Sequence, residues 1–351
     1  MPKIYDLVKA PAIGAYYTEA TENAIPYLGT AFFPDRKQAG LELSWLKGKG
    51  GLPVALKPSN FDAKATLRDR IGFSEINTEM PFFREAMKIK EKDRQKIMAL
   101  ENSDLKYVQP YIDRIFDDVK QLVDGATVQA ERMRMQLLAT GGIDIQANGL
   151  AYTYDYDPKG EFATNNMETL TGTHKWSDLT NSNPVDDIRE VQDKVEEDTG
   201  SRPTRAIMTR KTYNYLLNNA KIKTAINGVT NAAIAISEAQ LNNYLSQTLG
   251  ITCVIYTKKY KDESGATKNF YPDDQITLLP DGTLGNTWYG TTPEEADLMG
   301  GNTEASVSVV NTGVAVTTYK EVHPVNVNTV VSEIVVPSFE RMDEIFIMKV
   351  A

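Results

Sequence analysis

The stretch of residues 104–140 constrains the fold more than any other part of the chain. Its apolar residues recur every three or four positions, as they do on one face of a helix. These residues are Ile112, Ile115, Phe116, Val119, Leu122, Val123, Ala126, Ala130, Met133 and Leu137. Ser103 is a candidate N-cap, Gly141 is a candidate stop, and Pro110 should kink or delay the first turn. At ~1.5 Å per residue the helix would be on the order of 50 Å long. This length favours a helix that braces a flat or elongated domain, with a long bundle helix as the alternative.

Length and composition indicate a soluble chain of two or three domains. The chain has 351 residues, of which 41% are hydrophobic and 24% are charged, and these values permit a real core. No apolar run reaches the ~18 residues needed to span a bilayer, and the N-terminus lacks the layout of a signal peptide. We therefore expect a cytoplasmic protein. The single cysteine, Cys253, excludes an internal disulfide and a thiolate metal cluster. Its setting in ITCVIY predicts a buried, inert thiol.

Charge is distributed unevenly along the chain. Residues 1–100 carry 16 Lys and Arg against 12 Asp and Glu, a net charge of +4, within a total of −9. The remaining residues therefore carry −13. Such an acidic body disfavours a dedicated nucleic-acid-binding role, which needs concentrated positive charge. The basic leading segment could instead lie on the acidic surface of another copy of the chain, although simple compositional drift is an equal alternative.

The first hundred residues contain segments that we expect to lie against other surfaces. Residues 1–38 lack periodicity but are rich in proline and aromatic residues, which predicts an extended arm rather than a disordered tail. Residues 39–83 begin with the alternating run LELSWLKG, continue through the glycine-rich turn 48–51 and resume with LPVALK. A two-stranded excursion of this kind is marginal in isolation. Residues 84–102 are highly charged and predict a peripheral helix or an ordered loop.

The rest of the chain predicts a strand-rich domain interrupted by an α/β domain. Asn148-Gly149 lies between two alternating runs and predicts a hairpin over 143–157. From residue 184 onward, helices with clear start and stop signals alternate with short strands, which indicates a compact α/β domain. The tail is rich in β-branched residues and ends in a strand. We expect this last strand to pair with the hairpin 143–157.

No catalytic motif emerges from the sequence. The two histidines, His174 and His323, have no companions at metal-ligand or catalytic spacing. The run GKGG at 48–51 is not followed by the Lys-Ser/Thr and helix of a phosphate-binding loop. The run DYDPKG at 155–160 resembles the start of a calcium loop but places a lysine at a ligand position. A solvated turn is the better interpretation of each run, and we predict no catalytic, cofactor or metal site.

The order of these features resembles one family, the major capsid proteins of tailed bacteriophages. Four segments carry the resemblance, namely Phe32-Phe33-Pro34 leading into LELSWLKG, MPFFRE, the helix end ERMRMQLLATG, and VPSFERMDEIFIMKV. The helix end and the closing segment are the most specific of the four. The chain is similar to the lambda-type branch (capsid protein E) of the Hong Kong 97-type capsid fold, and the resemblance spans nearly its whole length.

The resemblance implies an α+β fold with a defined division of the chain. The implied parts are an N-terminal arm over 1–38, an extended β-hairpin loop over 39–83, a peripheral domain over 84–183 with a spine helix at 104–140, an inserted α/β axial domain over 184–320, and a return to the peripheral domain over 321–351. It also implies a non-enzymatic protein that self-assembles as pentamers and hexamers into the icosahedral head shell around double-stranded DNA. Assembly would take place in the host cytoplasm with a scaffold protein, a maturation protease and a portal. The packaged DNA would be contacted without sequence specificity, and no membrane is involved.

Aromatic and basic residues near the N-terminus are candidate contacts between subunits, because such anchors dominate interfaces. They are Tyr27, Phe32, Phe33, Trp45, Arg68, Arg70 and Phe73. Burial within their own subunit is the alternative for each aromatic residue. The underlying expectation is that residues 1–80 cannot bury their apolar surface alone and must pack on sibling copies. Some relatives form Lys–Asn crosslinks, but we find no matching partner for the lysines of this region and assign none.

Three alternatives remain open at this point. An encapsulin-like nanocompartment subunit would share the fold but hold protein cargo. An α/β-hydrolase-like enzyme could be built on residues 184–320, although no nucleophile and base are suitably spaced there. A different virion component, such as a tail tube or decoration protein, is the third.

Overall fold

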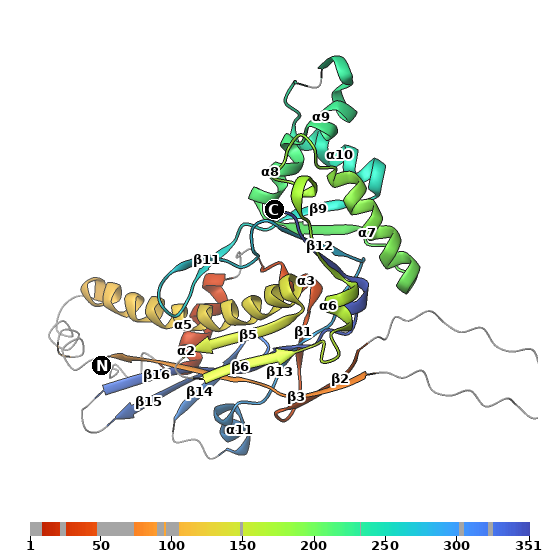
Figure 1. The fold of residues 1–351 in the computed structure, drawn as a ribbon. Coiled ribbons are helices and arrows are strands. Elements are labelled where there is room, and N and C mark those ends of the chain that lie inside the picture. Colours follow the sequence, from red (N-terminus) through yellow and green to blue (C-terminus); the bar gives the residue numbers. More distant parts are fainter. Residues whose placement is uncertain are drawn as a thin grey trace, which may run out of the picture. The chain divides into compact units, whose positions relative to one another are not determined.

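The computed structural model describes residues 9–21, 26–47, 74–89, 95, 105–147, 150–231, 233–301, 305–321 and 326–351. The chain forms two compact units, each built from segments that are distant in sequence (Figure 1). Unit 1 comprises residues 1–43, 78–134 and 286–338. Unit 2 comprises residues 44–77, 135–285 and 339–351.

A six-stranded sheet organises the described part of unit 1. Its strands are β1 (Asp35–Lys37), β4 (Phe82–Ile89), β13 (Thr287–Tyr289), β14 (Ser306–Val310), β15 (Val314–Glu321) and β16 (Asn326–Pro337). The order is β1-β13-β16-β15-β14, and β4 also pairs with β16. The long strand β16 pairs with β15 along one edge, and with β4 and then β13 along the other. The parallel pair β1–β13 places the short strand β1 at the edge of the sheet.

Helices cover both faces of this sheet. On one face, α2 (Ala10–Thr21) and α5 (Leu105–Thr140) pack against strand valines in a single apolar core. That core contains Ala10, Ile13, Tyr17, Ile112, Val119, Val123, Val310, Val314, Val316, Val327 and Val331. On the other face lies α11 (Pro293–Gly300), where Ser332 Oγ donates to the Glu294 carboxylate at 2.8 Å. Adjacent residues of a strand point to opposite faces, so Val331 and Ser332 contact different helices.

The long helix α5 confirms the central prediction from the sequence. It runs for 36 residues, about 54 Å, with Pro110 inside its first turns. It ends where predicted, because Gly141 adopts a φ of +73° and its N–H donates to Leu137 O at 2.9 Å. A Cβ atom at Gly141 would lie only 2.8 Å from Phe162 Cε1 and 2.9 Å from Met342 Cε. Both the backbone conformation and the available space therefore require glycine here.

A five-stranded mixed sheet forms the centre of the described part of unit 2. Its strands are β7 (Met167–Thr169), β8 (Arg205–Met208), β9 (Thr252–Ile255), β12 (Gln275–Leu279) and β17 (Phe346–Lys349), in the order β7-β17-β12-β8-β9. Its helices are α6 (Glu161–Asn165), α7 (Pro184–Thr199), α8 (Arg210–Asn218), α9 (Ala220–Asn227) and α10 (Glu238–Leu249). Two hairpins stand beside this sheet, β5 (Gly142–Ala147) with β6 (Leu150–Asp155), and β10 (Lys259–Lys261) with β11 (Thr267–Asn269).

The two faces of this sheet have different partners. Residues such as Met208, Leu278 and Phe346 share a core with apolar residues of α7 to α10. The opposite face contacts the end of α5, where Gln275 Nε2 donates to Ala139 O at 2.6 Å and Thr277 Oγ1 donates to Leu138 O at 2.7 Å. These two carbonyls belong to the last turn of the helix and have no partner within it. The sheet therefore completes the hydrogen bonding of the helix end.

Local signals in unit 2 are confirmed. Helix α7 begins with Pro184 as its first residue and stops at Gly200 in the left-handed conformation. Ser237 and Gln240 form the predicted capping box at the start of α10. Cys253 lies in β9 and is partly buried against the core, not fully buried as predicted; this burial raises the pKa of the thiol to about 12, so the thiol is neutral.

The predicted extended arm is wrong for the described residues of 1–38. Residues 10–21 form the helix α2, and residues 29–32 and 35–37 form the short helix α3 (Gly29–Phe32) and strand β1. Ala10, Ile13 and Tyr17 are buried in the core of unit 1. The sequence pattern missed this helix because its apolar face is narrow and its partners, β14 and β15, are about 300 residues away.

The peripheral helix or ordered loop predicted over residues 84–102 is wrong for residues 84–89, whereas Gln95, the other described residue of this range, is helical. Residues 82–89 form β4, which pairs with β16 over eight positions from Ile334↔Phe82 to Val327↔Ile89. Its charged side chains lie on exposed positions, so tertiary pairing overrides the helical preference of this charged run. In the predicted loop, β2 (Glu42–Lys47) pairs with β3 (Ser74–Glu79), and the predicted strand LPVALK lies outside the described residues.

The C-terminal strand does not pair with the hairpin 143–157, as we had expected. Strand β17 pairs with β12 and β7 inside unit 2, while β5 and β6 pair with each other. The strands β14 and β15, assigned to the inserted domain 184–320, belong to the sheet of unit 1. The compact units therefore divide near residues 135, 286 and 339 rather than near 184 and 321. Strand pairing across long sequence separations decides these boundaries, and periodicity does not reveal it.

Candidate assembly surfaces

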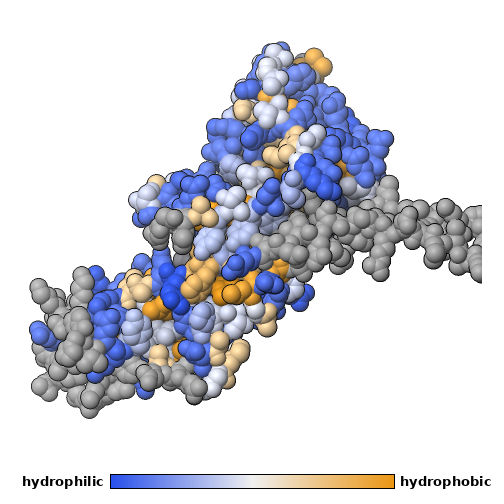
Figure 2. Space-filling model, turned by 60° about the horizontal axis from the view of Figure 1, so that its bottom comes forward, coloured by the Kyte–Doolittle hydropathy of each residue, from blue (hydrophilic) through white to orange (hydrophobic). Residues whose placement is uncertain are grey.

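Among the described residues of unit 2, the most exposed large apolar side chains lie in the loop between α9 and α10. Val229 is 84% exposed and Ile234 is 57% exposed. Asn227 Nδ2 donates to Ile234 O at 2.9 Å and closes the loop on itself. Residues 224–237 contain no charged side chain, in a protein of which 24% is charged. Figure 2 shows an orange patch at the end of the largely blue unit 2. We call this loop, residues 228–236, the apolar tip.

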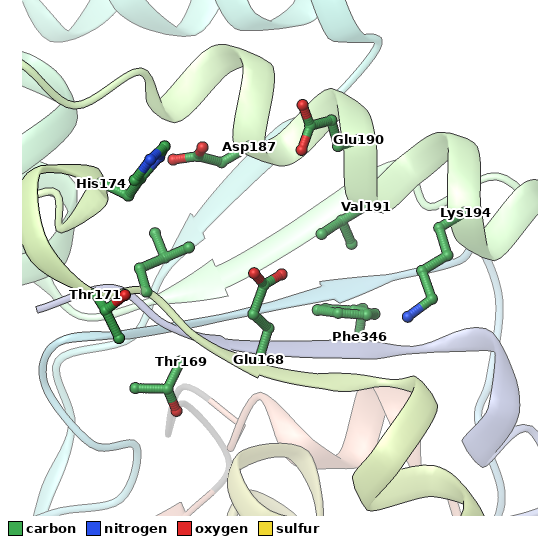
Figure 3. Close-up of a pocket in the computed structure, with 10 residues that line it drawn as sticks. Glu168, Thr169, Thr171, His174, Asp187, Glu190, Val191, Lys194 and Phe346 are labelled. Atoms are coloured by element: carbon green, nitrogen blue, oxygen red, sulfur yellow. The ribbon is translucent and has the colours of Figure 1, made fainter.

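A second feature of unit 2 is an open pocket of about 350 Å³ between β7, β17 and α7 (Figure 3). The side chains of Glu168, His174, Asp187 and Glu190 surround it, with Lys194 at one end. The remaining lining residues are Thr169, Leu170, Thr171, Val191 and Phe346. Its lining thus combines three carboxylates with one lysine and one histidine.

Two groups of this pocket, Asp187 and Lys194, already have partners in the fold. Trp176 Nε1 donates to Asp187 Oδ2 at 2.8 Å, and Lys194 Nζ donates to Asn165 O at 2.5 Å while lying 5.2 Å from the centre of the Phe346 ring. Burial raises the pKa of Asp187, whereas the bond from Trp176 opposes that rise. Within the described ranges no group of three or more His, Cys, Asp or Glu residues could hold a metal ion. The described His174 lines this pocket, and His323 lies outside the described residues.

The structure places the predicted contact residues in three different settings. Phe32 and Phe33 are 1% and 0% exposed in a single subunit, so the alternative of burial within their own subunit applies to them. Tyr27 is half-buried, and Trp45 lies in β2. Arg68, Arg70 and Phe73 lie outside the described residues. The contact role therefore stays a prediction for these three residues and for Tyr27 and Trp45.

Sequence reasoning missed a buried ionic cluster in unit 1. Arg134 is 1% exposed and forms an ion pair with Asp35 at the start of β1. Arg134 Nε also donates to Thr287 Oγ1 at 2.8 Å, and Nη1 lies 3.6 Å from Glu131 Oε2. Glu131 is fully buried, and its Oε1 accepts from the Gly29 N–H at 3.1 Å. The available signal was a pair of opposite charges three residues apart on the apolar side of α5.

This ionic cluster attaches the segment of residues 29–37 to the rest of unit 1. Thr287 Oγ1 donates to Phe33 O at 2.8 Å, and Lys37 forms an ion pair with the buried Glu295 at 2.5 Å. A Cβ atom at Gly29 would lie 2.3 Å from Glu131 Oε2 and 2.7 Å from Arg134 Cδ, so glycine is needed for this approach. The segment is thus held by charges at both ends.

Two solved structures share this fold over nearly their whole length. A protein described as the capsid protein of an Escherichia coli prophage matches with a TM-score of 0.60 and 17% identity, over 98% of this chain and 99% of that chain. A phage-related protein from Bordetella bronchiseptica matches with a TM-score of 0.56 and 13% identity, over 97% of each chain. At these identities the likeness shows the fold alone. The mixed arrangement of helices and sheets is therefore that of phage capsid proteins.

The family assignment comes from the sequence itself. The family described as phage major capsid protein E matches residues 12–350, and the chain belongs to this family. It is thus a structural subunit of the head shell that encloses the double-stranded DNA of a tailed phage. A search of curated proteins finds no match.

The comparisons also bear on the alternatives. An encapsulin from Synechococcus elongatus matches with a TM-score of 0.41 and 10% identity, over 93% of this chain and 88% of that chain. This similarity is too low to support the nanocompartment alternative. Among the described residues, no helix combines the length and the apolar character needed to cross a membrane.

Proposed function

We propose that unit 2 is the axial domain of a Hong Kong 97-type subunit and that its apolar tip meets the tips of neighbouring copies around the five-fold and six-fold axes. Unit 1, with α5 as its spine, is then the peripheral domain. The exposure of Val229 and Ile234 is the observation that carries this proposal. Large apolar side chains exposed to this degree indicate an interaction site when they lie together in one loop.

The absence of charge in residues 224–237 supports the same assignment. In a ring of identical subunits, each loop meets a copy of itself or of its neighbour, so any charge near the axis would face a like charge. An uncharged loop avoids that repulsion. Burial of apolar surface contributes roughly 25 cal/mol per Å², so covering two large side chains per subunit contributes a few kcal/mol to each ring.

The paired strands β2 and β3 form the described base of the extended loop over residues 39–83. We propose that this loop lies on a neighbouring subunit, with Trp45, Arg68, Arg70 and Phe73 among its contacts. Support comes from charge, because residues 1–100 are net positive while the rest of the chain carries −13. Electrostatic attraction between the basic region of one copy and the acidic region of another favours their association.

The remaining roles follow from the shell function. We propose that a separate scaffold protein, a maturation protease and a portal take part in assembly in the host cytoplasm. The packaged DNA is contacted without sequence specificity. An acidic body suits this last role, because a shell that bound DNA through many phosphate contacts would hold it tightly. The chain itself acts as a structural component and not as an enzyme.

The proposal is tested by placing a charge in the apolar tip. Val229→Asp and Ile234→Asp should leave the circular dichroism spectrum of the subunit unchanged and abolish rings and shells in sedimentation and negative-stain microscopy. Leu179→Asp is the matched control, because Leu179 is an exposed leucine of unit 2 outside the tip. Shells formed at wild-type yield by both tip variants would contradict the axial assignment.

A further inference from the structure

One buried carboxyl group in unit 1 has no hydrogen-bond partner. Glu333 lies in β16 and is 1% exposed. Neither of its carboxylate oxygens has a hydrogen-bond partner in the part of the chain that the structure describes. Leaving a buried ionised carboxylate without a partner costs several kcal/mol, so such a group normally takes up a proton. An unpartnered buried carboxyl group of this kind is unusual in a folded protein.

The groups around Glu333 come from four elements. Arg134 of α5 attracts its charge, whereas Asp35 of β1 repels it. Tyr289 of β13 interacts with it electrostatically and is itself 5% exposed. On β4 the residue opposite Glu333 is Phe83, and Glu85 lies on the same face but is exposed. Arg134 is thus the cation that could neutralise an ionised Glu333.

Arg134 already forms ion pairs and a hydrogen bond with other groups. It pairs with Asp35 and Glu131 and donates to Thr287. With Glu333 neutral, one guanidinium faces two carboxylates. Ionisation of Glu333 would place three carboxylates around that single cation in a site shielded from water. Burial accordingly raises the pKa of Glu333 well above its usual value, and the charge of Asp35 adds to the rise while Arg134 opposes it.

Strand β1 (Asp35–Lys37) is the part of this site that can open most easily. Strand β1 has three residues, all exposed, and pairs only with β13 in the described sheet. In contrast, β16 is paired along both edges and α5 is 36 residues long. Short exposed edge elements open locally at a lower free energy than central strands.

We propose that Glu333 is a neutral carboxylic acid in the folded subunit and acts as a proton-dependent latch, so that its ionisation releases strand β1 from Arg134 of α5 and from β13, while Phe32 and Phe33 stay buried. When β1 opens, water reaches Glu333, its proton passes to water, and the resulting carboxylate competes with Asp35 for Arg134. This device sits within one subunit and goes beyond the shell function. It makes the attachment of β1 responsive to pH.

The latch makes a quantitative prediction about opening. Because the pKa of Glu333 is raised in the closed state, opening releases a proton at every pH between the ordinary value of about 4.3 and the raised value. Within that window the opening equilibrium constant rises about tenfold per pH unit. The closed position of β1 is therefore most stable at acid pH and loses stability as pH rises.

Hydrogen–deuterium exchange of the full-length subunit tests this directly. The Gln38 N–H, directly after β1, donates to Tyr289 O at 2.8 Å, so this amide reports on opening of β1. Exchange is measured from about pH 6 to about pH 9 and divided by the intrinsic rate of the denatured chain at each pH. Wild type should show the tenfold slope at pH values below the raised pKa of Glu333 and level off above it, and Glu333→Gln, which cannot ionise, should show no slope. Glu321→Gln is the control, since Glu321 lies on the same sheet with its side chain 34% exposed and pairs with Lys88.

A second variant separates Glu333 from its neighbour. Burial also raises the pKa of Asp35, and Arg134 opposes that rise. If Glu333 is the latch, Asp35→Asn keeps the pH slope of exchange although β1 is held less firmly. A slope that persists in Glu333→Gln and disappears in Asp35→Asn would overturn the proposal. So would a flat profile in wild type. The infrared carbonyl band of a protonated carboxylic acid, present in wild type and lost in Glu333→Gln, provides an independent readout that does not depend on opening.

Discussion

Replacing Arg134 by methionine tests the buried ionic cluster most directly. Methionine keeps the length and much of the volume of the side chain but removes the guanidinium. The change leaves Glu131, fully buried, without its cation, and deprives Asp35 and Thr287 of their partner. Asp35 retains 31% exposure of its side chain and can be solvated, so most of the cost falls on Glu131.

The expected loss follows from the burial of the pair. Removing one partner of a buried ion pair destabilises proteins by about 3–5 kcal/mol, because the other charge remains uncompensated. For a unit of this size such a loss lowers the midpoint of thermal unfolding by on the order of 10 °C. Urea denaturation and calorimetry of the unassembled subunit measure both quantities. The loss should be smaller at acid pH, where a buried carboxyl group can be neutral.

Two companion variants decide whether the reasoning holds. Arg189→Met removes an ion pair with Asp186 on the surface of α7, where both side chains are about half exposed, and should cost under about 1 kcal/mol. Adding Glu131→Gln to Arg134→Met should recover part of the loss, because the uncompensated charge is then removed. An Arg134→Met variant as stable as Arg189→Met would refute the buried-charge argument.

Two further predictions concern the core and the end of α5. Phe33→Ala should destabilise the isolated subunit by about 3–5 kcal/mol, because Phe33 is 0% exposed. Chemical denaturation of unassembled subunits measures this loss. If stability is unchanged and assembly is weaker, Phe33 is a contact between subunits, as first predicted. Gly141→Ala should cost at least about 1 kcal/mol of stability, because the backbone there has a positive φ and the added methyl group would meet Phe162 and Met342. Gly265 also has a positive φ but open space around it, so Gly265→Ala should cost less in the same denaturation experiment.

The structure changes the argument for assembly. We expected residues 1–80 to need sibling copies in order to bury their apolar surface. Instead α2 completes the core of unit 1, and Phe32 and Phe33 are buried in a single subunit. That argument therefore fails for the described part of the N-terminal segment. The shell function rests on the family match over residues 12–350, the shared fold and the exposed apolar tip.

Several elements could be predicted because their signals are local. The end of α5, the capping box at Ser237 and Gln240, and the stop at Gly200 depend on residues within one or two turns. The predicted N-cap of α5, Ser103, lies outside the described residues. The two-residue connection between β5 and β6 was likewise visible as Asn148-Gly149 between alternating runs. In each case the residues that determine the geometry are neighbours in the chain.

Other elements could not be predicted because their partners are remote. Strand β4 has a charged sequence typical of a helix, and its pairing with β16, about 240 residues away, makes it a strand. Arg134 lies in the middle of an apolar helix face, and its burial is explained by the ion pair with Asp35, which is remote in sequence. From the sequence alone, Glu333 cannot be distinguished from an exposed charged residue of a strand, because its burial is visible only in the structure.

The sequence by itself determined the long helix, its C-terminal end, the hairpin and the family of the protein, because periodicity, capping and motif order are properties of adjacent residues. Only the tertiary structure decided where the units divide, which strands pair and which charges are buried. Those features depend on contacts between residues tens to hundreds of positions apart, and their stability comes from desolvation and packing that no short window of sequence contains.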